Sequence, residues 1–236
     1  MKDCFKYLNL MIYLLFTIFT VSPVDSMPEQ KSTYRPPKGK TREQVRKAGG
    51  SRGECNLPSN NTITLLVPQD HTPSTVLERP TFLWHLSQKV SLPLRFTLLE
   101  PGQKPIFVEQ LKPKPGIVAL KLPYNSPPLK IGKTYRWTVT IICNQKRPSR
   151  NMFAQAWIER VALPKEERLS NNTANTLCSL KYAREGIWYD ALACNYSKLV
   201  RTQNNAGNSS WQQFKTLLSE IDLVYLGQQT SKLSLY

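Results

Sequence analysis

Short apolar runs alternate with turn residues through the middle of the chain. Seven runs are separated by segments rich in Pro, Gly, Asn and Ser: Thr62–Val67, Thr81–Leu86, Leu94–Glu100, Ile106–Leu111, Ile117–Leu122, Thr134–Cys143 and Met152–Val161. In the sixth run Tyr135, Trp137 and Val139 share one face, and polar residues lie between them. A period of two is typical of β-strands that bury one face. The pattern predicts a β-sandwich of about seven strands, with a partly closed barrel as the alternative.

The turn before the sixth run indicates which type of β-sandwich to expect. It has the sequence Leu-Lys-Ile-Gly-Lys-Thr-Tyr at residues 129–135 and resembles the turn that enters the sixth strand of fibronectin type III-like domains. In that turn the tyrosine ring packs inside and its hydroxyl bonds to upstream backbone, an arrangement called the tyrosine corner. Tyr135 would take this role, and Trp84 would be the matching buried indole. We expect an immunoglobulin/fibronectin III-like sandwich over residues 55–163.

Beyond residue 163 the apolar residues recur at steps of three and four, which is typical of helices. The predicted helices are Ala174–Glu185, Ile187–Arg201 and Trp211–Ile221. Gly186 separates the first two as a helix stop. We expect a helical hairpin plus a third helix in an appendage over residues 164–225, followed by a disordered tail over residues 226–236.

The N-terminal residues 1–26 predict a secretory signal peptide. Lysines at positions 2 and 6 precede the uncharged apolar run Leu8–Val21, and short residues then suit cleavage after Ser26. The run has 14 residues, fewer than the roughly 20 that span a bilayer, so an integral membrane protein is not expected. Residues 27–54 are rich in Pro, Gly and basic side chains, which predicts a disordered basic linker. We expect a secreted or periplasmic protein.

Four cysteines follow the signal peptide: Cys55, Cys143, Cys178 and Cys194. An even number in an exported chain predicts disulfide bonds, although four cysteines allow three pairings. We favour a bond between Cys55 and Cys143, which joins the linker's end to the sandwich. The other two cysteines would then join the arms of the helical hairpin. Zinc is the alternative, but there is no C-x-x-C motif, and His71 and His85 lie far from any cysteine pair. We expect no metal and no cofactor.

The formal net charge is +16. Residues 54–160 alone carry fourteen basic and six acidic side chains. Such a field attracts polyanions, and outside the cytosol these are envelope polymers or anionic lipids rather than nucleic acid. The candidate anion-binding residues lie between predicted strands: Lys112, Lys114, Lys146, Arg147 and Arg150. A soluble basic protein without a specific anion is the alternative.

Residues for catalysis are few. Nucleophilic catalysis needs a base beside the nucleophile, and His71 and His85 are both expected at the surface. Among the carboxylates, Glu166-Glu167 looks like a helix start, and Glu185 and Asp190 flank Gly186. We therefore expect a protein that is not an enzyme.

Several segments in fixed order resemble a known family. They are residues 49–55 (GGSRGEC), 80–82 (PTF), 127–137 (PPLKIGKTYRW), 142–144 (ICN), 157–161 (WIERV) and 186–192 (GIWYDAL). The set is similar to a cyanobacterial family of exported proteins classified as domain of unknown function nine hundred twenty-eight. The resemblance covers about residues 49–225 and implies an exported cyanobacterial protein. It implies no activity and no catalytic residues.

Three functional hypotheses follow from these observations. The first is an exported, non-catalytic module that binds an anionic polymer or a protein of the cell envelope. The second is an adaptor whose partner surface is formed by helical aromatic residues: Trp188, Tyr189 and Trp211. In the alternative interpretation, Trp188 attaches the helices to the sandwich together with Ile187 and Leu192. The third hypothesis is a hydrolase of wall glycan or peptide.

Overall fold

A computed structural model describes residues 34–37, 46–49, 55, 63–163, 178–201, 209–229 and 233–235. All of them fall within the unit Ser32–Tyr236. The predicted signal peptide and the first part of the helical appendage, residues 164–177 with Glu166-Glu167, lie outside the described residues.

The smaller of two sheets contains β2 (Ile63–Leu65), β4 (Thr81–Leu86), β7 (Gly116–Lys121) and β10 (Leu233–Leu235). Their order is β10-β7-β4-β2. Strand β4 pairs antiparallel with both β2 and β7, whereas β10 runs parallel to β7. The residues of β4 and β7 are almost continuously apolar and are buried on both faces, so other elements must cover each face of this sheet.

The larger sheet contains β1 (Arg46–Gly49), β3 (Ser74–Thr75), β5 (Leu94–Leu99), β6 (Pro105–Leu111), β8 (Thr134–Ile141) and β9 (Met152–Arg160). The order is β1-β9-β8-β5-β6, and β3 pairs in parallel with β9. In β5 and β8, buried residues alternate with half-buried ones. The period of two in the sequence therefore arises because each of these strands turns one face to the interior and the other to the outside. Each of the seven predicted strands is present.

The core lies between the two sheets. Phe82 of β4 contacts Phe96 of β5 and Trp137 of β8, with ring centroids 5.0 and 5.2 Å apart. Trp84 is fully buried beside Phe96, as expected of the predicted indole. These aromatic rings bury large apolar areas and hold the facing strands at a defined separation.

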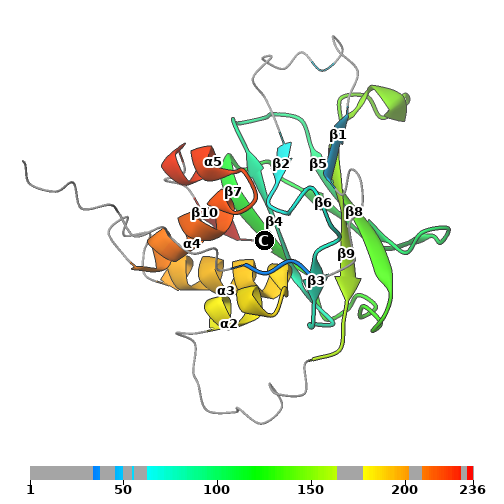
Figure 1. Ribbon diagram of the computed structural model, residues 1–236. Coiled ribbons are helices and arrows are strands. Elements are labelled where there is room, and N and C mark those ends of the chain that lie inside the picture. Colours follow the sequence, from blue (N-terminus) through cyan, green and yellow to red (C-terminus); the bar gives the residue numbers. More distant parts are fainter. Residues whose placement is uncertain are drawn as a thin grey trace, which may run out of the picture. The chain divides into compact units, whose positions relative to one another are not determined.

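Helices cover the other face of the smaller sheet (Figure 1). They are α2 (Cys178–Arg184), α3 (Trp188–Arg201), α4 (Ser209–Ser219) and α5 (Val224–Gln229). Helix α3 packs against β4, and the Tyr196 hydroxyl donates to the Ile117 carbonyl of β7 at 3.4 Å. This packing explains why His85 is only 6% exposed. The prediction that His85 lies at the surface is wrong, and burial lowers the pKa of its imidazole.

The predicted tyrosine corner is present at the start of β8. Tyr135 is buried, and its hydroxyl accepts a hydrogen bond from the Lys130 amide at 3.0 Å. Gly132 within the turn has a φ of 75°, a left-handed conformation that glycine adopts without steric cost. The turn residues noted in the sequence therefore close the loop that positions β8.

Two segments predicted to be disordered contribute to the fold. In the predicted linker 27–54, Tyr34 is buried and β1 pairs antiparallel with β9. In the predicted tail 226–236, α5 continues to Gln229 and β10 adds a strand to β7. The described residues of both segments thus contact distant parts of the chain, β1 and β10 through strand pairing and Tyr34 through the rings of His71 and Trp188.

Candidate functional site

The predicted anion-binding residues meet at one end of the larger sheet. Leu94 of β5 lies opposite Leu111 of β6 and Ile141 of β8, and Ile141 lies opposite Met152 of β9. The connection after β6 (residues 112–115) and the β8–β9 loop (residues 142–151) therefore leave the same end. The structure brings together the two groups of basic residues that the sequence singled out separately.

A third loop joins them there. Leu86, the last residue of β4, pairs with Gly116 at the start of β7, so the β4–β5 loop (residues 87–93) also lies at this end. The three loops contain no Asp or Glu and six basic residues, which we call the basic end: Lys89, Lys112, Lys114, Lys146, Arg147 and Arg150. Lys114 and Arg150 are half-buried and the other four are exposed. Sequence reasoning missed Lys89, because only the strand order places its loop beside the others.

Charges at the opposite end of the two sheets are arranged differently. Lys133 Nζ lies 2.9 Å from a carboxylate oxygen of Glu100, and this hydrogen bond raises the pKa of the Lys133 ammonium. Arg79 pairs with the neighbouring Glu78. Acids and bases are thus interspersed there, whereas the three loops of the basic end contribute only positive charge.

The β8–β9 loop is held by its own asparagines. Asn151 Oδ1 accepts hydrogen bonds from the amides of Cys143 and Asn144, each at 2.9 Å. Asn144 Oδ1 in turn accepts from the amides of Lys146 and Arg147, each at 2.9 Å. The bonds of Asn144 to the amides two and three residues later are typical of Asx turns, whereas Asn151 joins the two ends of the loop. These hydrogen bonds define the backbone that carries three of the six cations.

A disulfide bond braces the same loop. Cys55 and Cys143 are bonded, with their Cα atoms 5.1 Å apart, which confirms the predicted pair. Cys55 Sγ also lies 3.9 Å from the carbonyl oxygen of Arg150, so the bridge touches both ends of the loop. Cys194 in α3 is disulfide-bonded as well. The side chain of Cys178 lies outside the described residues, so its bond with Cys194 stays a prediction.

The predicted partner surface does not form as expected. Trp188 is fully buried and donates to the Leu66 carbonyl at 2.9 Å. The Tyr189 hydroxyl accepts from Trp137 Nε1 at 2.7 Å and donates to the Trp157 carbonyl at 2.8 Å. Both side chains attach α3 to the sheets, so neither can present a partner surface. Trp211 is half-buried.

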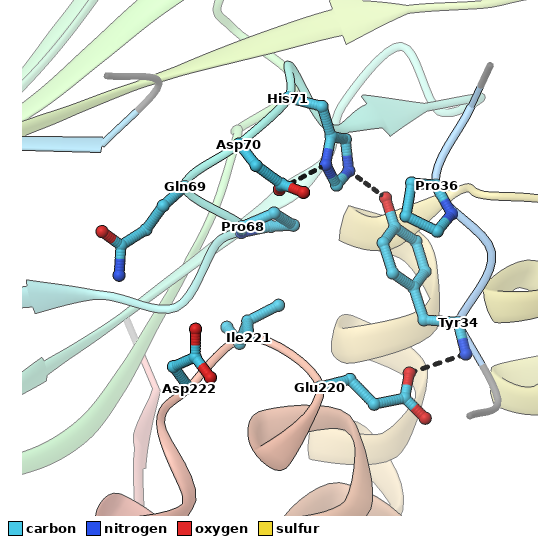
Figure 2. Close-up of a pocket in the computed structure, with 9 residues that line it drawn as sticks. All are labelled: Tyr34, Pro36, Pro68, Gln69, Asp70, His71, Glu220, Ile221 and Asp222. Atoms are coloured by element: carbon cyan, nitrogen blue, oxygen red, sulfur yellow. Dashed lines mark hydrogen bonds and ion pairs between the residues drawn. The ribbon is translucent and has the colours of Figure 1, made fainter. Parts of the chain in front are cut away.

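A pocket of about 190 Å³ lies where residues 34–37 meet the end of α4 (Figure 2). His71, predicted at the surface, is only 3% exposed and lines this pocket. Its Nδ1 bonds to Asp70 Oδ1 at 2.7 Å and its Nε2 to the Tyr34 hydroxyl at 2.6 Å. Since an ionised carboxylate only accepts, the consistent arrangement has Nδ1–H donating to Asp70 and Tyr34 donating to Nε2. Glu220 and Asp222 add two further carboxylates to the lining.

This chain of groups has the order carboxylate, imidazole, hydroxyl, as in hydrolytic triads. Its hydroxyl, however, is a buried phenol. Burial, and then the nearby charges of Asp70 and Glu220, raise the pKa of Tyr34 far above its ordinary value. A phenol that stays protonated is a poor nucleophile. The network instead fastens the N-terminal segment, because Glu220 also accepts from the Tyr34 amide at 2.6 Å and the Arg35 amide donates to the Ala183 carbonyl at 3.0 Å.

The remaining candidates for acid–base chemistry lie apart from this pocket. Glu185 is exposed. Asp190 is buried at the start of α3, where Oδ2 accepts from the Val76 amide at 3.3 Å. Burial raises the pKa of Asp190 to about 6. Across the described ranges, no three His, Cys, Asp or Glu residues lie close enough to hold a metal ion.

No helix in the part of the chain that the structure describes is both long enough and apolar enough to cross a membrane.

Comparison with known proteins places the chain in a family. No curated protein matches the sequence. The chain belongs to the family described as Domain of Unknown Function (DUF928), whose sequence pattern it matches over residues 47–231.

Proposed function

We propose that this protein is an exported, non-catalytic binding module whose basic end holds an anionic polymer of the cell envelope. The observation that carries the proposal is the convergence of six cations on three loops without an acidic residue. Like charges on neighbouring loops raise the local positive potential, which attracts polyanions and speeds their association. The charge of +16 extends this attraction over the whole molecule.

An immunoglobulin/fibronectin III-like core is part of the proposal. The strand orders β2-β4-β7 and β6-β5-β8-β9 and the hydrogen bond from the Lys130 amide to Tyr135 support it. In sandwiches of this type, the loops between strands cluster at the two ends and carry binding residues on a rigid scaffold. The disulfide and the two asparagines in the β8–β9 loop suit such a role, because a preorganised loop loses less entropy on binding.

The export of the protein is also a proposal. It rests on the N-terminal sequence pattern and on the family resemblance, which further suggests a cyanobacterial source. The bond between Cys55 and Cys143 suits an oxidising compartment. In the envelope of such a cell, the available polyanions are wall polymers, lipopolysaccharide and acidic exopolysaccharide rather than nucleic acid. The three loops also contain no aromatic residue on which nucleic-acid bases could stack.

Co-sedimentation with envelope fractions tests the proposal. Protein lacking residues 1–26 is mixed with peptidoglycan, outer-membrane vesicles or acidic exopolysaccharide at about 20 and about 500 mM salt, which spans the range from weak to strong screening. We expect the double variant Lys146→Glu/Arg147→Glu to lose most of the low-salt binding. Its matched control is Lys104→Glu/Lys130→Glu, which makes the same change in charge at the opposite end.

Equal binding by the two variants would overturn the role of the basic end, because net charge alone would then explain capture. Capture of one fraction that survives high salt would point to contacts beyond charge. An unchanged thermal unfolding midpoint in each variant shows that the fold is intact, so that a loss of binding reports the altered side chains.

A further inference from the structure

The larger sheet has an outer face whose side chains remain partly accessible. Along β5, β8 and β9 every second residue is half-buried, in contrast to β4 and β7, where both faces are buried under neighbouring layers. The half-buried set on the central part of this face includes aromatic, basic and polar side chains: Arg95, Arg136, Thr138, Phe153, Gln155 and Trp157. We call this set the sheet face.

The strand register defines how these residues are arranged. Trp157 of β9 lies opposite Arg136 of β8, and Gln155 lies opposite Thr138. Phe153 and Trp157 are four residues apart on one strand, so their side chains lie about 13 Å apart on the same face, with Gln155 between them. The sheet face therefore offers two aromatic side chains in a row, with an amide between them and a hydroxyl beside it.

An arginine side chain accompanies each of the two aromatic residues of the sheet face. Arg136 Cζ lies 6.0 Å from the centroid of the Trp157 ring, a cation–π contact that orients the indole. Arg95 lies in the same row as Phe153, because both pair with Thr140 of β8, which separates them. Glu159, the acid on the described part of β9, lies at the margin of the face opposite Thr134. The centre of the sheet face thus has positive charge beside apolar rings.

The sheet face borders the basic end. Arg95 follows Leu94, and Phe153 follows Met152, the two strand ends from which the basic loops depart. A polymer lying along β9 would pass from Trp157 over Gln155 and Phe153 to the β8–β9 loop. Its charges would then meet Lys146 and Arg147.

We propose that the sheet face binds the sugar rings of an acidic polysaccharide. Phe153 and Trp157, about 13 Å apart, contact the apolar faces of two sugar units that are not adjacent in the polymer, while Arg95 and Arg136 bind carboxylate or sulfate groups, which guanidinium groups recognise through paired hydrogen bonds. Gln155 and Thr138 bond to ring hydroxyls. This inference rests on the proposed function for the charge of the polymer, but it uses separate side chains and names the polymer class.

The test compares a polyanion that contains sugar rings with one that contains none. Polygalacturonate carries carboxylates on sugar rings, whereas inorganic polyphosphate carries charge without any ring. Binding of the protein lacking residues 1–26 is measured for both by isothermal titration calorimetry. For Trp157→Ala and Phe153→Ala we expect affinity for polygalacturonate to fall about tenfold, the size of one good aromatic contact. Affinity for polyphosphate should change less than about twofold.

Matched variants make the outcome specific. Trp157→Leu keeps an apolar side chain without a flat ring and should bind polygalacturonate as weakly as Trp157→Ala. Tyr124→Ala removes an exposed aromatic residue at the opposite end, which is flanked by Arg79 and Lys121, and should leave both affinities unchanged. Unaltered affinity in the Trp157 and Phe153 variants, or an equal loss for both polymers, would overturn the inference.

The proposed function and this inference fail in different ways. If Lys146→Glu/Arg147→Glu weakens binding of both polymers while Trp157→Ala weakens binding of neither, the proposed role of the basic end is supported and that of the sheet face is overturned. If neither variant changes either affinity, both are overturned. A single-stranded oligothymidine is the third probe, because stacking beside cations also suits nucleic-acid bases. Tighter binding of that probe than of polygalacturonate, lost in Trp157→Ala, would replace the glycan with a nucleic acid.

Discussion

The Tyr34 hydroxyl and His71 Nε2 lie 2.6 Å apart, although 37 positions separate the two residues in the sequence. The Tyr34 ring also stands edge-on to Trp188 of α3, with centroids 4.9 Å apart. One side chain from an otherwise polar, proline-rich segment thus joins a loop after β2, a helix and the N-terminal part of the chain. It serves as an anchor for residues 34–37.

Removing the Tyr34 hydroxyl tests this anchor. Tyr34→Phe keeps the ring but leaves the buried His71 imidazole without its partner at Nε2, so we expect a loss of about 1–3 kcal/mol in the free energy of unfolding. Urea denaturation measures it. Tyr124→Phe, at a tyrosine that is 82% exposed, is the control and should leave stability unchanged. Equal midpoints for all three proteins would contradict the anchoring role.

Tyr189 joins α3 to the larger sheet through two hydrogen bonds. In Tyr189→Phe the Trp137 indole loses its acceptor and the Trp157 carbonyl loses a donor. Since Trp137 is fully buried, we expect unfolding to become easier by about 1–3 kcal/mol. A double-mutant cycle with Trp137→Phe isolates the pair, and its coupling energy should be clearly above zero. A coupling energy near zero would show that the hydrogen bond between Trp137 and Tyr189 does not contribute to stability.

The disulfide between Cys55 and Cys143 spans 88 positions. Replacing both cysteines by serine should lower the free energy of unfolding by about 2–5 kcal/mol, because the bridge restricts a long loop in the unfolded chain. The variant should also bind anionic polymers more weakly, because the β8–β9 loop loses its brace. Chemical denaturation and calorimetry measure the two effects. The double serine variant is more informative than reduction, which would also break the bond at Cys194. Unaltered polymer affinity would show that the disulfide does not contribute to binding by the β8–β9 loop.

Asp190 makes stability depend on pH. Its folded pKa of about 6 lies above the ordinary value of 3.8, so between these values the folded state holds the proton that the unfolded state releases. Stability from this group is therefore fully present below about pH 4 and falls as pH rises to about 6, by up to about 3 kcal/mol. Asp190→Asn keeps an oxygen for the Val76 amide but cannot titrate. Urea denaturation from pH 4 to 7 should show a flatter profile in Asp190→Asn, and parallel profiles would contradict the assignment.

The central strands could be predicted because local pattern and tertiary environment agree. In β8 the alternation from Tyr135 to Ile141 follows from one buried face, and Gly132 with Tyr135 marks the turn that precedes it. Among the three possible pairings, the organisation predicted from the sequence alone favours the bond between Cys55 and Cys143. These features depend on residues close in sequence or on small numbers of alternatives.

The features that escaped prediction depend on distant partners. Strands β1, β3 and β10 are two to four residues long, too short to display a period, and form because β9 and β7 offer edges to pair with. The alternation along β4 places His85 on the face opposite Trp84, but that face is buried only because the helices cover it. Lys89 joins the basic end through strand order, which periodicity does not encode.

The parallel pairing of β10 with β7 also constrains the order in which the protein assembles. Leu233 lies opposite Ile117, so more than one hundred intervening residues must be synthesised and brought back before this edge is closed. Contacts of such long sequence separation slow folding, and an unpaired strand edge favours association with other chains in the meantime. If the chain crosses a membrane unfolded, the exposed edge of β7 is the place where a chaperone would be most useful during the interval before β10 arrives.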